Sequence, residues 1–390
     1  MRTTSKSSIL FCFFVFFLVT GYDHRIRFWS AAGGICTRVV KFPDSQVNKL
    51  EITPDKQFLA AAGNPHIKLY DIANSNESQP VLTLEGHASS VTAIGFQRDG
   101  RFLYSGSEDG TVKLWDLRQN TASRSFAVKS QVRSATLRVD RDEIISGDAS
   151  GYVSVWDLGG HGRSSDQYMM GKHHDDAGRT VGDNSDENIN DPASSQNAQN
   201  DAAAGPAINK NMNNRHSGGT RQKRKGCLQQ VQPGKNNTGG CLMQTAIQAV
   251  DISYDSRQLV AVSNHGTVYV YDPISHNFLS NPPITKFRAH PPGSYCLHAK
   301  ISPDCRRLCT TSSDGTARLF DTTTWELCHN LQKHTKWVWD AAFCADSSYL
   351  VTASSDSTAL LWNLRSSETV RLYEGHNGPV SCVALNDSSV

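Results

Sequence analysis

The segment DGTVKLWD, residues 109–116, contains the pattern that decides the fold. An Asp-Gly turn precedes alternating apolar residues, and the run ends in an aromatic residue followed by an aspartate. Alternation after a tight turn is typical of a short β-strand with one buried face. The pattern recurs along the chain, with its terminal aromatic residue at positions 29, 70, 115, 156, 271, 320 and 362. The sequence therefore predicts seven copies of one β-rich unit.

Each copy is preceded by a second apolar strand in the same register. Its first apolar residue is, in ring order, Val47, Val91, Val132, Ile247, Cys296, Val338 and Val380. Five of the six intervals between the terminal aromatic residues lie between 41 and 49 residues, the period of four-stranded WD repeats. We therefore predict an all-β, seven-bladed WD-repeat propeller, interrupted by one long disordered insertion.

The two ends of the chain are expected to build one blade together. The last upstream strand, residues 380–386, has no repeat after it, and the first repeat, residues 23–29, has no complete upstream strand. Joining them closes the ring and removes exposed sheet edges.

Histidine, aspartate and aromatic residues recur at fixed places in the repeats. We expect the histidine to donate to the turn aspartate while the aromatic residue covers the pair, because a buried polar set stabilises a fold only when it is complete. These sets are interpreted as structural, not as catalytic triads. They are His87 with Asp109 and Trp115, His334 with Asp356 and Trp362, and His376 with Asp23 and Trp29.

The stretch 159–245 differs in composition, being rich in Asn, Asp, Ser and Gly without hydrophobic periodicity, and we expect most of it to be disordered. The propeller is then formed by residues 21–158 and 246–390. Residues 227–232 are interpreted as a displaced outer strand of the fourth blade. A basic cluster in the insertion is either an import signal or a solvated charge run; it consists of Arg221, Lys223, Arg224 and Lys225.

Residues 1–20 allow two interpretations. A basic flank and an apolar run of eleven residues, 9–19, fit a secretory leader, although no clear cleavage site follows. The same run leads directly into residues 18–23, which align with a repeat core, so it also fits a hydrophobic first strand.

Composition and motifs narrow the function classes. The net charge of +2 argues against nucleic acid as the main partner. The ten cysteines form no CxxC pair and are expected to be reduced thiols. With none of the common hydrolase, nucleotide or metal motifs in the sequence, we expect no enzyme activity, no cofactor, no metal and no small-molecule substrate.

Several segments outside the repeat pattern resemble the small WD-repeat subunit of the TOR kinase complexes. The resemblance covers some 290 residues on both sides of the insertion and is carried by residues 21–24, 27–29, 34–38, 44–48, 60–63, 66–67, 352–356 and 385–387. It implies a subunit of TOR complex 1 or TOR complex 2 that binds the catalytic domain of the TOR kinase and stabilises its active-site region in nutrient and growth signalling.

By this resemblance, the kinase-binding positions correspond to Gln46, Asn48, Trp337 and Trp339. They flank the first apolar residue of two upstream strands, Val47 and Val338, so alternation turns them toward the mouth of the propeller. Tryptophan is enriched in binding hot spots, although packing against neighbouring loops is the alternative role for the Trp pair.

Two other function classes are alternatives to the kinase subunit. A substrate receptor of a ubiquitin ligase would need a helical adaptor module, and a secreted propeller would need a genuine leader and paired cysteines. The cytoplasmic kinase subunit, at endomembranes through its complex, is the expected function.

Overall fold

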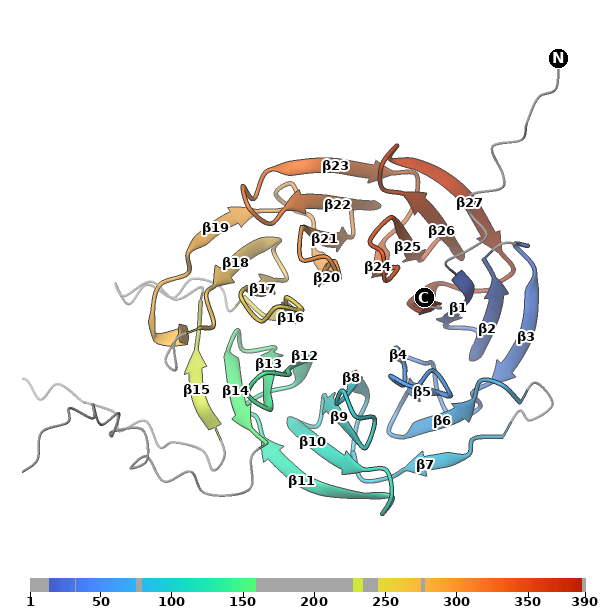
Figure 1. Ribbon diagram of the computed structural model, residues 1–390, viewed down its shortest axis with the longest axis horizontal. Coiled ribbons are helices and arrows are strands. Elements are labelled where there is room, and N and C mark those ends of the chain that lie inside the picture. Colours follow the sequence, from blue (N-terminus) through green and yellow to red (C-terminus); the bar gives the residue numbers. More distant parts are fainter. Residues whose placement is uncertain are drawn as a thin grey trace, which may run out of the picture. The chain divides into compact units, whose positions relative to one another are not determined.

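The computed structural model describes residues 14–31, 33–74, 79–158, 227–233, 245–274 and 278–387. They belong to one compact unit, made of residues 1–160 and 223–390. In this unit seven antiparallel four-stranded sheets are arranged as blades around a common centre (Figure 1). The predicted all-β, seven-bladed propeller is confirmed. Most of the predicted insertion, including the basic cluster at 221–225, lies outside the described residues.

The first three blades follow one another along the chain. Blade 1 is β4 (Lys49–Ile52), β5 (Phe58–Ala62), β6 (Ile67–Asp71) and β7 (Leu82–Leu84). Blade 2 is β8 (Val91–Phe96), β9 (Phe102–Ser107), β10 (Thr111–Asp116) and β11 (Thr121–Ala127). Blade 3 is β12 (Val132–Arg138), β13 (Glu143–Asp148), β14 (Val153–Asp157) and β15 (Cys227–Val231).

The remaining blades complete the ring. Blade 4 is β16 (Ile247–Ile252), β17 (Leu259–Ser263), β18 (Thr267–Tyr271) and β19 (Thr285–Arg288), with a short 3₁₀ helix, η2 (Phe278–Ser280), before β19. Blade 5 is β20 (Cys296–Ile301), β21 (Arg307–Ser312), β22 (Thr316–Asp321) and β23 (Leu327–Gln332). Blade 6 is β24 (Val338–Phe343), β25 (Tyr349–Ser354), β26 (Thr358–Asn363) and β27 (Glu368–Glu374). The closing blade is β28 (Val380–Asp387), β1 (Phe14–Gly21), β2 (Arg25–Ser30) and β3 (Cys36–Lys41).

The strand boundaries match the predicted register closely. Six of the seven innermost strands begin at the predicted apolar residue, and β4 begins two residues later, at Lys49 rather than Val47. The predicted outer strand of the fourth repeat, here blade 3, is present as β15, which pairs with β14 across the insertion.

The closing blade joins the two ends of the chain, as predicted. Strand β1 pairs antiparallel with β28 on one side and β2 on the other (Figure 1). Its side chains at residues 17–19 are buried on both faces: Leu18 packs toward blade 1, whereas Phe17 and Val19 pack toward blade 6. A strand covered on both faces has no polar alternation. This burial explains the apolar residues 17–19, and the strand that contains them begins at Phe14.

All inner strands begin on one side of the ring, because each blade repeats the same antiparallel order. The turns between the second and third strands of the blades lie on this side too. We call it the strand-entry face.

Candidate partner-binding face

Gln46 and Asn48 lie together at the strand-entry face of blade 1. The Gln46 side-chain amide donates to Asn48 Oδ1 over 3.3 Å. Asn48 Nδ2 in turn donates to the backbone carbonyl of Val91 in blade 2, at 3.1 Å. Asn48 therefore both links two blades and presents a fixed amide at the mouth.

Trp337 and Trp339 lie together in blade 6. Their ring centroids are 5.5 Å apart with the planes inclined at 54°, a favourable geometry for an aromatic pair. Trp339 Nε1 donates to Ser355 Oγ over 2.6 Å, which fixes its ring. Trp337 remains 43% exposed, although a tryptophan ring left in water forfeits much of its apolar burial.

Tyr22 lies on the blade between the Gln46–Asn48 pair and the Trp337–Trp339 pair. No pattern in the sequence marks it as a contact residue. It lies in the turn between β1 and β2, on the closing blade between blades 6 and 1, and is 44% exposed. It lines the channel mouth together with Gln46, Asn48 and Trp339. It also lines a neighbouring hollow of about 540 Å³ with Trp337 and Pro379. The predicted ring closure could have indicated this position of Tyr22, because closure places the closing blade between blade 6 and blade 1, which contain the two pairs.

We call the five side chains that line the channel mouth and the neighbouring hollow the mouth face: Tyr22, Gln46, Asn48, Trp337 and Trp339. It combines exposed aromatic rings with amide hydrogen-bonding groups, the composition of a protein-binding hot spot.

The predicted histidine sets are brought together in blades 2 and 6. In blade 2, His87 Nδ1 lies 2.7 Å from Asp109 and its Nε2 lies 2.7 Å from Ser105 Oγ. Trp115 Nε1 donates to the same hydroxyl at 2.8 Å. Burial lowers the pKa of His87 despite the nearby carboxylate. The neutral ring can then donate to Asp109 and accept from Ser105, so both ring nitrogens of His87 and the Trp115 N–H have partners in this network.

Blade 6 repeats this arrangement with a threonine. His334 Nδ1 lies 2.8 Å from Asp356, and its Nε2 lies 2.8 Å from Thr352 Oγ1. Trp362 Nε1 donates to the same oxygen at 2.9 Å. The hydroxyl between histidine and tryptophan was not anticipated from the sequence.

The closing blade brings His376 and Asp23 together but lacks that hydroxyl. His376 Nδ1 lies 3.2 Å from the Asp23 carboxylate, and Arg27 lies within hydrogen-bonding distance of both residues. Val19 pairs with Arg27 just as Ser105 pairs with Lys113 in blade 2. With valine at this position, His376 Nε2 and Trp29 Nε1 are both buried without a hydrogen-bond partner.

Replacing Val19 with threonine is therefore expected to stabilise the protein. A hydroxyl of nearly the same shape would accept from both orphaned nitrogens, and the expected gain in the free energy of unfolding is about 1 kcal/mol. Urea unfolding of Val19→Thr beside the unmodified chain measures it. Ser105→Val is the matched reverse change and should destabilise by about 2 kcal/mol, since it removes a hydroxyl that has two partners. A Val19→Thr variant less stable than the unmodified chain would contradict the assignment.

Acid is expected to destabilise the propeller through these aspartates. Burial would raise the pKa of Asp109, but hydrogen bonds from Thr111, the Ala88 amide and His87 lower it to about 2. Similar hydrogen bonds hold the pKa values of Asp23 and Asp356 well below the usual range. Because the unfolded chain takes up these protons at about pH 4 and the folded chain only near pH 2, stability must fall as the pH drops through this interval.

Urea unfolding at pH 7, 5, 4 and 3 checks this expectation. The lowered pKa of His87 acts in the same direction below about pH 6.5. Asp109→Asn should be less stable at pH 7 and should lose less on acidification. Equal stability of the unmodified chain at pH 7 and pH 3 would contradict the prediction.

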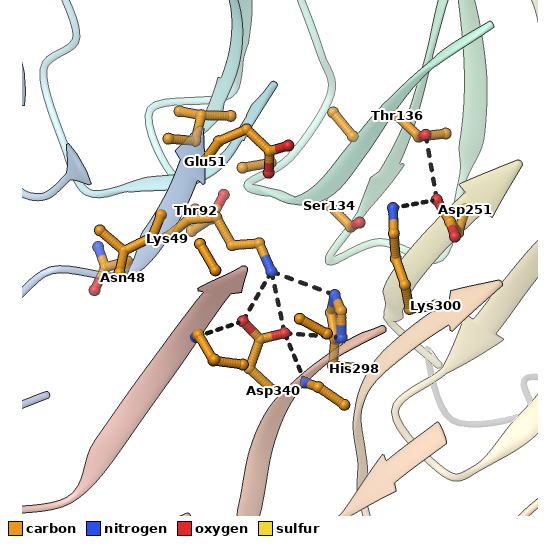
Figure 2. A pocket seen from close by; sticks show the side chains of 18 of the residues that line it. Asn48, Lys49, Glu51, Thr92, Ser134, Thr136, Asp251, His298, Lys300 and Asp340 are labelled. Atoms are coloured by element: carbon orange, nitrogen blue, oxygen red, sulfur yellow. Dashed lines mark hydrogen bonds and ion pairs between the residues drawn. The ribbon is translucent and has the colours of Figure 1, made fainter. Parts of the chain in front are cut away.

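The channel behind the mouth face contains charged side chains in two layers. The cavity has a volume of about 730 Å³. In the layer nearer the mouth, Lys49 contacts Asp340 and His298, and in the next layer Lys300 contacts Asp251 at 3.0 Å (Figure 2). Burial and the nearby Lys49 lower the pKa of His298, which favours its neutral form.

Among the described residues, no group of three or more His, Cys, Asp or Glu side chains could hold a metal ion. The basic cluster of Arg221, Lys223, Arg224 and Lys225 lies outside them. Within the same part of the chain, no helix has the length and apolar character needed to span a membrane.

The ring of blades, its histidine networks and its open mouth define a WD-repeat β-propeller. In agreement, the family model for the WD domain, G-beta repeat, matches residues 78–116, 281–321 and 325–363.

Comparison with whole proteins identifies the family of WD-repeat propellers to which the chain belongs. The chain is 37% identical over 379 residues to the Schizosaccharomyces pombe protein named target of rapamycin complex subunit wat1, covering 96% of this chain and 97% of that protein. It is 35% identical to target of rapamycin complex subunit LST8 of Saccharomyces cerevisiae (96% and 99% covered) and 33% identical to LST8 of Mus musculus (96% and 95%). The chain belongs to this family of target of rapamycin (TOR) complex subunits. None of these names supports the ubiquitin-ligase alternative.

Proposed function

We propose that this protein is a non-catalytic subunit of the TOR kinase complexes that binds the kinase catalytic domain and stabilises it in nutrient and growth signalling. The observation that carries the proposal is the mouth face. Its predicted residues are far apart in the sequence, yet they line the channel mouth and an adjoining hollow, both of which Tyr22 also lines; this shared lining supports the proposal.

The exposure of the Trp pair supports binding over a packing role. Trp339 is held by Ser355, whereas Trp337 leans on Trp339 and still exposes 43% of its surface. A partner that covers this ring would gain apolar burial without first ordering the site, because the pair is already fixed.

The charged groups of the channel support a structural role rather than catalysis. Lys49 and Lys300 are each paired with a buried aspartate, which raises the pKa of the lysine, so neither lysine has a pKa near neutral pH as a general acid or base would. We place the protein in the cytoplasm and, through the kinase complex, at endomembranes.

Affinity purification of the tagged full chain from cells, followed by mass spectrometry, tests the proposal. Near-stoichiometric recovery of a TOR-type kinase is expected. The full chain is required, because β1 begins at Phe14 and supplies the strand between β28 and β2. Recovery of cullin-type ligase components without a kinase would overturn the proposal.

A further inference from the structure

An ion pair crosses the channel just below the mouth face. Lys49 Nζ lies 3.1 Å from both carboxylate oxygens of Asp340 (Figure 2). Lys49 is on β4 of blade 1 and Asp340 is on β24 of blade 6. The pair therefore joins two blades that are not neighbours, because β28 of the closing blade lies between them and contacts both.

Asp340 also holds the strand that lies between these blades. Its Oδ2 accepts the backbone N–H of Val383 on β28 at 3.2 Å, and its Oδ1 accepts the N–H of Ala341 at 3.0 Å. The Asp340 side chain is only 4% exposed and that of Lys49 is 23% exposed. One carboxylate thus ties blade 6, the closing blade and blade 1 together.

The pair remains charged over the physiological range. Burial would raise the pKa of Asp340, but Lys49 and His298 lower it far below its usual range. Burial opposes the charge of Lys49, yet Asp340 outweighs this effect and raises the pKa of Lys49.

The two charged residues follow directly after two mouth-face residues. Lys49 comes after Asn48, and Asp340 comes after Trp339. Adjacent Cα atoms are held about 3.8 Å apart by the peptide bond, so the distance across the ion pair constrains the distance between the amide half and the tryptophan half of the face.

This constraint acts at the one junction of the ring that chain connectivity does not close. The closing blade combines strands from both ends of the chain, and β28 and β1 are held together by strand pairing and packing rather than by a connecting segment. Its histidine network also contains the two unpartnered nitrogens described above. The Lys49–Asp340 ion pair joins blades 1 and 6 directly, across this blade. It can therefore set the spacing between the amide half and the tryptophan half of the mouth face.

We propose that Lys49 and Asp340 are positioning residues for the partner, holding the Gln46–Asn48 and Trp337–Trp339 halves of the mouth face at the spacing that the kinase catalytic domain binds. The inference rests on the proposed function. Removing one charge alone would leave the other buried and unpaired, with a large cost in stability. The informative variant is therefore the double change Lys49→Met with Asp340→Asn, which removes the ion pair and leaves no unpaired charge.

The test measures the affinity of the purified full chain for the TOR kinase catalytic domain, with the free energy of unfolding measured in parallel. We expect the double change to weaken binding about tenfold in the otherwise unmodified chain. In a chain that already carries Gln46→Ala and Asn48→Ala, we expect it to change affinity by less than about twofold, because spacing no longer matters when one half is absent. The matched control is the double change Lys300→Met with Asp251→Asn. It removes the ion pair between blades 4 and 5, leaves no unpaired charge, and should leave affinity unchanged.

The possible outcomes separate the two proposals. Equal losses of affinity in both backgrounds would indicate general destabilisation and overturn the positioning role. Unchanged affinity in the otherwise unmodified chain would also overturn it, while leaving the proposed function intact. If the unmodified chain does not bind the kinase domain at all, the proposed function fails and this inference fails with it.

Discussion

Replacing Trp337 and Trp339 together by alanine is expected to abolish binding to the TOR kinase catalytic domain while the propeller stays folded. The two rings pack on each other at the mouth, and Trp337 exposes nearly half of its surface before any partner arrives. Truncating a hot-spot tryptophan costs about 2–4 kcal/mol of binding free energy. Even one such loss lowers the affinity about 30-fold or more, because each 1.4 kcal/mol is a factor of ten.

Co-purification of the double variant with the kinase checks the first part, and circular dichroism checks that the fold is retained. Tyr254→Ala is the matched control. Tyr254 is 73% exposed and lies between β16 and β17, on the face opposite the mouth, so its loss should leave binding intact. If the Trp variant loses its fold along with its binding, the pair has the packing role instead.

Removing residues 380–390 is expected to have the largest effect on stability. Strand β28 would be lost, which leaves one edge of β1 without a partner and uncovers residues packed against it on both sides. The change also removes the Val383 N–H that Asp340 accepts. Val380, Cys382 and Val383 are almost fully buried, and a buried valine contributes about 1.5–3 kcal/mol. The summed loss is therefore a large part of the 5–15 kcal/mol by which folded domains are stable.

Expression of the shortened chain, followed by thermal unfolding, measures this effect. A synthetic peptide of residues 376–390 provides the control, because the unpaired edge of β1 is a template for one specific strand. Added peptide should restore a cooperative transition in the shortened chain and should not affect the full-length protein. A shortened chain with unchanged stability would show that the closing blade does not require β28.

The repeat made most of the fold predictable. The seven aromatic positions and seven upstream apolar positions depend on strand alternation and turn chemistry, which are local, and their register reappears in the structure with a shift at β4 alone. Ring closure followed from counting strands. Even β15, beyond a long insertion, could be inferred because blade 3 would otherwise lack its outer strand.

The contacts between blades were not predictable in the same way. The Lys49–Asp340 pair joins residues 291 positions apart and skips one blade, and no local pattern determines which channel side chains meet. The missing hydroxyl at Val19 could be noticed only after the closing blade was aligned with blade 2. Tyr22 likewise acquires its place between the two halves of the mouth face from the closure of the ring.

Because the closing blade combines strands from both ends of the chain, its assembly is delayed during protein synthesis. The ribosome makes Thr20 long before Ser381, to which its backbone lies close in the folded blade, and the two are 361 residues apart. At 5–20 residues per second, about 20–70 s pass between them. Until β28 has been made, the apolar strand β1 therefore lacks its partner, and the closing blade cannot form. During biosynthesis, misassembly is thus most expected at β1, because the blade to which this strand belongs is completed last.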